Sequence, residues 1–207
     1  FFLTDFENIL RCYSIKDGKE LWNVKTETTF IKSQKKLSLV ILNEKVYFNN
    51  SIGDISAVDI NSGNLIWQAP TQSSAIYENA FLLKTSDLVA NNESILFSNN
   101  KNEFFSINAN LGTLNWKQKI NSNLRPTIVD DLIFTVTMKG FLVVVDNQTG
   151  DIIRITNVFD KIKESKRSKI RPVGFIVGTS NIYLTIDNGR LIIIDILSGK
   201  SSLILKI

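Results

Sequence analysis

Short apolar segments separated by polar turn residues recur along the whole 207-residue chain. A typical unit reads "LIFTVT", "FLVVVD" and "DIIRIT" in succession between residues 132 and 156. Segments of five or six residues rich in Val, Ile, Phe and Thr are typical of β-strands. No stretch shows the apolar spacing of three to four residues that an amphipathic helix requires. The pattern therefore predicts an all-β protein with less than about a tenth of the chain in helices.

Five glycines mark a repeat within this pattern. Spaced 45, 49, 38 and 49 residues apart, they are Gly18, Gly63, Gly112, Gly150 and Gly199. Four positions before them stand the short polar residues Ser14, Asp59, Asn108, Asp146 and Asp195. Such side chains accept hydrogen bonds from turn N–H groups, and glycine takes the left-handed conformation that closes a bulged hairpin. Both positions are therefore explained by turn chemistry, without a ligand.

Each complete unit is predicted to hold four antiparallel strands, because a further short strand precedes each pair of long ones. These first strands begin near Leu37, Asp87, Arg125 and Arg171. Four strands in about 45 residues are typical of a propeller blade. The third strands are apolar on both faces, which suits sheets buried between neighbouring blades. We expect one propeller domain over residues 1–207, with units near 1–27, 36–70, 86–120, 124–158 and 170–207, the first without its opening strand.

A tryptophan stands four residues after the glycine in three units: Trp22, Trp67 and Trp116. The fourth and fifth units have Arg154 and Leu203 at this position. The small residues Cys12, Ala57 and Ser106 stand ten positions before the tryptophans. The second unit is the most complete and reads Ala-x-Asp-x-x-Ser-Gly-x-x-x-Trp.

This pattern is similar to the tryptophan-docking repeat of the pyrroloquinoline-quinone-like β-propeller family. The resemblance implies that the tryptophans pack on the backbone of a neighbouring blade and that the small residues make room for this close approach. The tryptophans are then structural contacts rather than ligand-binding groups. Because five units do not complete the eight-bladed ring that the resemblance implies, we expect a fragment or an open arc of a longer propeller.

Composition narrows the chemistry that the chain can perform. It contains no histidine and a single cysteine, Cys12. Histidine is the commonest general base, and calcium prefers six to eight oxygen ligands, for which no acidic cluster stands out. The quinone-dependent dehydrogenases of the family are expected to hold their cofactor beside a disulfide between adjacent cysteines. We therefore expect no catalytic residue, no metal and no cofactor, and a fragment of such a dehydrogenase is the alternative.

The order and strand lengths of units two to five most resemble the BamB-type outer-membrane assembly lipoproteins, which are non-enzymatic scaffolds. The resemblance implies a periplasmic protein attached to the outer membrane, with the barrel-assembly protein as its partner. It also implies a lipid anchor. Cys12 is a poor site for this anchor, because Arg11 stands where lipidation requires a small residue, so the anchor is expected in a segment before Phe1. The acidic contact pair of the subfamily would fall at Ser33 to Lys36, where this sequence reads "SQKK". Partner contacts therefore cannot be transferred residue by residue.

One segment, "DKIKESKRSKIR" from Asp160 to Arg171, concentrates charge, with six basic residues and two acidic ones. We interpret it either as a solvated connector or as a contact for an acidic protein surface or for anionic head groups. Nucleic acid is not expected, because aromatic residues do not alternate with the basic ones. No apolar run is long enough to span a membrane, so no membrane span is expected either.

Arg125 and Arg171 each precede a proline at the start of a first strand, so both are expected at the same level of the ring. An arginine in this position either offers its five donors to a partner's carboxylate or caps a neighbouring turn. Together with Lys166 and Arg167 of the charged segment, these arginines are the predicted partner contacts.

Overall fold

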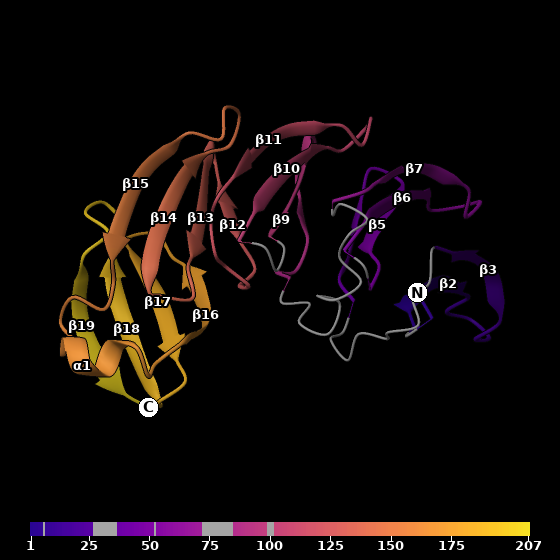
Figure 1. Ribbon diagram of the computed structural model, residues 1–207. Helices are drawn as coiled ribbons and strands as arrows, with labels where there is room; N and C mark the ends of the chain where they lie inside the picture. The colour runs from indigo at the N-terminus through magenta and orange to yellow at the C-terminus, as the bar shows by residue number, and fades with distance from the viewer. Residues whose placement is uncertain (6, 27–36, 52, 72–84, 99–101) are drawn as a thin grey trace.

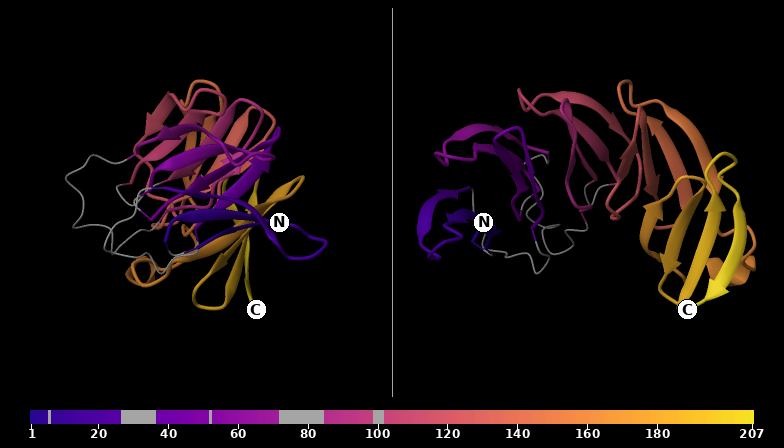
Figure 2. Two further views of the ribbon diagram at one scale, coloured as in Figure 1. Left: turned by 90° about the vertical axis from the view of Figure 1, so that its right-hand side faces the viewer. Right: turned by 180° about the vertical axis from the view of Figure 1, so that it is seen from behind.

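The computed structural model describes residues 1–5, 7–26, 37–51, 53–71, 85–98 and 102–207. Within these residues, 19 strands form five antiparallel sheets that lie side by side along an arc (Figure 1). Seen from behind, the chain passes from the first sheet to the last in sequence order (Figure 2). The prediction of an all-β propeller built from sequential blades is confirmed.

The strands of each blade follow one another in the sequence. Blade one contains β1 (Phe2–Thr4), β2 (Ile9–Tyr13) and β3 (Glu20–Lys25). Blade two contains β4 (Leu39–Leu42), β5 (Lys45–Asn49), β6 (Ile55–Asp59) and β7 (Leu65–Ala69). Blade three contains β8 (Val89–Ala90), β9 (Ser94–Ser98), β10 (Phe104–Asn108) and β11 (Leu114–Gln118). Blade four contains β12 (Thr127–Val129), β13 (Leu132–Val136), β14 (Phe141–Asp146) and β15 (Ile152–Asn157). Blade five contains β16 (Pro172–Val177), β17 (Asn181–Ile186), β18 (Arg190–Asp195) and β19 (Ser201–Lys206).

A short helix interrupts the all-strand pattern. Helix α1 (Glu164–Arg167) forms a single turn in the connector between blades four and five. The apolar spacing gave no sign of it, and none of its four residues is buried. One turn with no buried face has no apolar periodicity to detect, so the pattern could not predict this helix.

The core is divided among the interfaces between neighbouring blades. Strand β14 illustrates the arrangement, because its successive side chains face opposite sides of the sheet. Leu142 and Val144 pack with residues of blade five, whereas Val143 and Val145 pack with residues of blade three. Further clusters join blades two and three and blades one and two. A strand covered on both faces is mainly apolar, as the third-strand pattern predicted.

The turn before each fourth strand has the geometry that its sequence predicts. In blade two, Asp59 Oδ1 accepts hydrogen bonds from the backbone N–H groups of Asn61 at 3.1 Å and Ser62 at 2.7 Å. Gly63 has φ of +74°, in the left-handed region, and its N–H donates to the Asp59 carbonyl. The strand register then shifts by one residue between Ala57 and Val58. The turn is thus a bulged hairpin that positions the following strand.

Candidate partner-binding surfaces

The tryptophan of each of the first three blades docks on the glycine turn of the next blade. Trp67 of blade two donates its Nε1 hydrogen to the carbonyl of Ala109 in blade three, at 3.1 Å. Its indole covers Gly112, where a Cβ atom would lie 2.6 Å from Trp67 Cδ2. Only glycine leaves room for this contact, so the turn glycine serves both the backbone conformation and the docking.

The same contact recurs at the interfaces on either side. Trp22 donates to the carbonyl of Ile60 at 3.2 Å, and a Cβ on Gly63 would lie 2.7 Å from its ring. Trp116 donates to the carbonyl of Asn147 at 3.0 Å. All three indoles therefore contact backbone of a neighbouring blade.

Arg154 occupies the corresponding position between blades four and five. Its Nη2 donates to the carbonyl of Ile196 at 2.8 Å, and its Nη1 donates to the carbonyl of Leu197. A Cβ on Gly199 would lie 3.1 Å from Arg154 Nε. The Ile196 carbonyl follows the turn aspartate directly, as the carbonyls that accept from the tryptophans follow theirs. The sequence indicated only a missing tryptophan, whereas the structure shows an arginine making the equivalent contact.

The acidic residues at repeat spacing are engaged in their turns. Hydrogen bonds from the Ser62 backbone hold the pKa of Asp59 below its ordinary value of 3.8. The backbone N–H of Thr149 acts similarly on Asp146, and the hydroxyl of Ser198 lowers the pKa of Asp195. In the residues that the structure describes, no three His, Cys, Asp or Glu side chains come close enough together to hold a metal ion.

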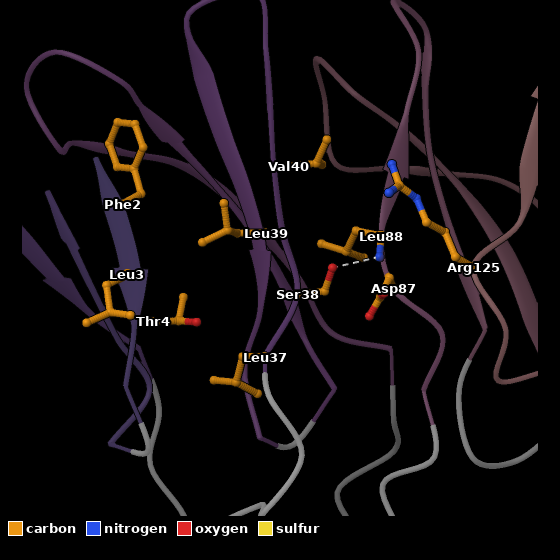
Figure 3. A pocket seen from close by; sticks show the side chains of 10 residues that line it. All are labelled: Phe2, Leu3, Thr4, Leu37, Ser38, Leu39, Val40, Asp87, Leu88 and Arg125. Carbon is orange, nitrogen blue, oxygen red and sulfur yellow. Dashed lines mark hydrogen bonds between the residues drawn. The ribbon is translucent and has the colours of Figure 1, made fainter. Parts of the chain in front are cut away.

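A groove of about 470 Å³ runs along the inner edges of blades one to four (Figure 3). Its walls come from residues 2–4 of β1, residues 37–40 at the start of β4, and Leu88 before β8. Ser38 Oγ accepts a hydrogen bond from the Leu88 N–H at 2.9 Å, which ties blade two to blade three. The groove mixes apolar and polar lining, with Asp87 and Arg125 as charged residues.

Arg125 presents its guanidinium to this groove. The side chain is exposed and forms no hydrogen bond or ion pair with any other residue that the structure describes. In Figure 3 the guanidinium lies beside Leu88, while the carboxylate of Asp87 points in another direction. Its donors are therefore open to an acceptor on a partner.

The two other predicted arginines bond to their own connector. Arg167 donates from Nε to the carbonyl of Ile162 at 2.7 Å and from Nη2 to the carbonyl of Asp160 at 2.8 Å. Arg171 Nη1 donates to the carbonyls of Ser168 at 2.7 Å and Ile170 at 2.9 Å. These bonds match the turn-capping interpretation of Arg171.

The four basic residues predicted as partner contacts do not form one site. Lys166 is exposed and lines a second groove, on blade five, whereas Arg125 lines the inner groove. Sequence reasoning missed two residues that lie with Lys166 in that second groove, Arg190 and Lys206. They pair across β18 and β19, and the hairpin around Gly199 was the signal that could have placed them together.

Three further points from the sequence concern the expected position of the acidic contact pair, Cys12 and membrane spans. The segment from Ser33 to Lys36 lies outside the described residues. Cys12 is buried and forms no disulfide. None of the helices within the described residues is long and apolar enough to cross a membrane.

A match to a known family model shows to which family the chain belongs. The sequence profile described as "Outer membrane protein assembly factor BamB" matches residues 1–156. The chain belongs to the BamB family. A comparison of the sequence with curated proteins found no significant match.

Solved structures share the fold. BamB from Moraxella catarrhalis superposes with a TM-score of 0.74 at 16% identity, covering 99% of this chain and 60% of that one. The quinohemoprotein alcohol dehydrogenase ADHIIG from Pseudomonas putida HK5 has a TM-score of 0.71 at 10% identity, covering 100% of this chain and 40% of that one. The computationally designed Ika8 protein has a TM-score of 0.68 at 14% identity, covering 93% and 54%. The chain thus spans 40–60% of the length of these structures.

Proposed function

We propose that the chain is a non-enzymatic scaffold of the outer-membrane β-barrel assembly machinery, acting in the periplasm beside the outer membrane. The observation that carries this proposal is the BamB family match over residues 1–156. Residues 1–207 act as one propeller domain in this proposal, and the barrel-assembly protein is the partner. A rigid frame of sheets that presents loops and grooves suits protein recognition.

The inner groove is the proposed partner surface, with Arg125 as its main polar contact. The groove combines exposed apolar residues such as Leu3 with a guanidinium that has no partner among the described residues. Arginine offers planar, paired donors to a carboxylate, so the partner segment should carry an acidic residue beside an apolar one. The bonds of Arg171 and Arg167 to backbone carbonyls make them supports of the connector in this proposal.

Co-purification tests this function. Tagged protein isolated from solubilised membranes of its source organism should bring down the barrel-assembly protein, and Arg125→Glu should reduce the yield at least about tenfold, as expected for an interface anchor. Lys139→Glu is the matched control, because Lys139 is exposed and lies outside the inner groove. If the parent protein does not bring down the barrel-assembly protein, the proposed function is contradicted. Equal loss in both variants would remove Arg125 from the interface.

A titration with pyrroloquinoline quinone and calcium tests the non-enzymatic part of the proposal. We expect no saturable binding and no change in melting temperature, because a ligand that binds the folded state alone would raise it. Saturable binding in the micromolar range with thermal stabilisation would favour a dehydrogenase fragment instead.

A further inference from the structure

The connector lysines meet the last hairpin of blade five in a basic groove. Five cationic side chains, from three separate parts of the sequence, line a volume of about 420 Å³: Lys161, Lys163, Lys166, Arg190 and Lys206. The first three flank or belong to α1, which lies beside β19 (Figure 1). No carboxylate lines this basic groove within the described part of the chain.

The five cations are exposed, and none forms an ion pair with another residue that the structure describes. The two acidic residues of the connector do not neutralise them. Asp160 Oδ1 accepts hydrogen bonds from the Lys161 N–H and the Ser201 hydroxyl, and Glu164 lies outside the basic groove. The connector directs both of its arginines back to backbone carbonyls, and Lys161 Nζ likewise donates to the Ser202 carbonyl at 2.6 Å. Lys163 and Lys166 are the connector cations of this groove whose side chains form no hydrogen bond with the described residues.

Apolar residues border these cations. Ile204 and Leu205 line the basic groove beside Lys206, and Leu205 and the following Ile207 are 40% and 70% exposed. Lysine is a flexible, hydrated point charge that binds phosphate without requiring one fixed orientation. Cations beside exposed apolar side chains match the interface of a membrane, where head groups border acyl chains.

We propose that this basic groove binds the phosphate groups of anionic lipid head groups and holds blade five against a lipid surface. The contact is separate from the inner groove proposed for protein recognition, because the two share no lining residue. Each basic residue near such a surface contributes to binding, and the attraction weakens as salt screens it.

Vesicle flotation tests the proposal with the full chain. The protein should float with phosphatidylcholine vesicles that contain about 30% phosphatidylglycerol and not with pure phosphatidylcholine, at low salt. The variant K161Q/K163Q/K166Q/R190Q/K206Q should bind about three-thousandfold more weakly, at about fivefold for each of the five cations removed. The double variant K163Q/K166Q, whose side chains make no hydrogen bond among the described residues, should lose about twenty-five-fold by the same reasoning.

The matched control removes five exposed lysines that lie outside the basic groove: Lys16, Lys25, Lys119, Lys139 and Lys200. It has the same net charge as the five-residue variant and should keep its binding within about tenfold, since lysines dispersed over the molecule cannot all approach one lipid surface and the attraction falls off within a Debye length. Circular dichroism should show that all variants fold. Equal losses in control and groove variants would overturn the proposal, as would flotation that does not depend on phosphatidylglycerol.

Competition distinguishes the sources of the anion. Inorganic phosphate should displace the protein from vesicles no better than chloride at equal ionic strength, because a lipid surface presents many phosphates at once. Displacement by phosphate alone would assign the basic groove to free phosphate and overturn the lipid proposal. Stronger displacement by poly-glutamate than by chloride at equal ionic strength would likewise assign it to an acidic protein.

Discussion

In blades one to four, the side chain four positions after the turn glycine joins the blade to the next one. Trp67 and Arg154 both donate to the carbonyl that follows a turn residue, although one is aromatic and the other cationic. Their cross-strand neighbours differ in size accordingly, because Ala57 lies opposite Trp67 and Val144 lies opposite Arg154. A wide indole requires a small neighbour, whereas the slimmer arginine leaves space for a branched one. Each docking residue is therefore matched to its neighbour.

This match predicts a coupled effect on stability. Arg154→Trp should destabilise the protein, because the indole and Val144 would compete for the same space. Adding Val144→Ala should relieve the conflict, so the double variant should be more stable than the sum of the single changes by about 1–2 kcal/mol. Urea unfolding of the parent and the three variants measures this coupling. Val145→Ala is the control partner, since Val145 faces blade three, and its effect should be additive with Arg154→Trp.

At the scale of the element, one hairpin turn serves two neighbouring blades. Gly112 closes the turn of blade three with φ of +72° and also receives the indole of Trp67. Gly18 has nearly the same backbone conformation, with φ of +70°, but no atom of the described residues lies within 4 Å of the position its Cβ would take. The two glycines therefore separate the cost of the backbone conformation from the cost of blocking the docking.

Alanine substitution should distinguish these costs. Gly18→Ala should lower the stability of the protein by about 1–2 kcal/mol, which is the strain of placing an L-residue in the left-handed region. Gly112→Ala should lose about 2 kcal/mol more, because the new methyl group displaces Trp67 and strains the packing. Chemical denaturation of both variants checks the difference. Equal losses would show that the indole moves aside without cost.

The turn carboxylates make stability depend on acidity. Hydrogen bonds from Ser62, Thr149 and Ser198 lower the pKa values of Asp59, Asp146 and Asp195 in the folded protein. Because each carboxylate has a lower pKa in the folded state than in the unfolded state, its charged form stabilises the fold at pH values above the ordinary pKa of 3.8. This contribution is lost as the pH falls through the lowered pKa values.

The triple variant D59N/D146N/D195N should therefore lose less stability than the parent between about pH 5 and about pH 3. Asparagine keeps the accepting oxygen of each turn but does not titrate in this range. The urea midpoint, measured by tryptophan fluorescence at intervals of pH, gives the comparison. Parallel curves for the two proteins would show that these turns do not set the acid sensitivity.

At the scale of the whole molecule, the blades form a chain of neighbouring interfaces. Each core cluster joins adjacent blades, and each docking residue donates to a turn carbonyl of the next blade. Stability in such an arrangement is approximately a sum of terms for the units and for the interfaces between neighbours. Damage at one interface should therefore remain close to it.

Trp67→Ala tests this locality. Removing the indole should destabilise the protein by about 3–5 kcal/mol, because it leaves a cavity between blades two and three. Amide hydrogen exchange should accelerate most in β6, β7 and β10, and least in β17 and β18 of blade five. Uniform acceleration across all blades would show that the arc opens as one cooperative unit instead.

The sequence alone determined the strands, the turns and the blade order, because these depend on interactions between residues close in the chain. The aspartate or asparagine of each turn, its glycine and the flanking strands lie within one hairpin, so local chemistry specifies them. The direction of Trp67 was also predictable, but through the family resemblance rather than through the spacing itself.

Only the tertiary structure decided which long side chains bond to nearby backbone and which stay open to a groove. Arg154 is an ordinary basic residue in the sequence, and the neighbouring turn of blade five makes it a docking residue. Arg171 and Arg125 both precede a proline, yet the first bonds to nearby carbonyls and the second stays open to the inner groove. Lys166 meets Arg190 and Lys206 because a connector folds beside a hairpin. The direction of a flexible cationic side chain depends on the acceptors that packing brings near it. The spacing of residues along one strand does not reveal which acceptors these are.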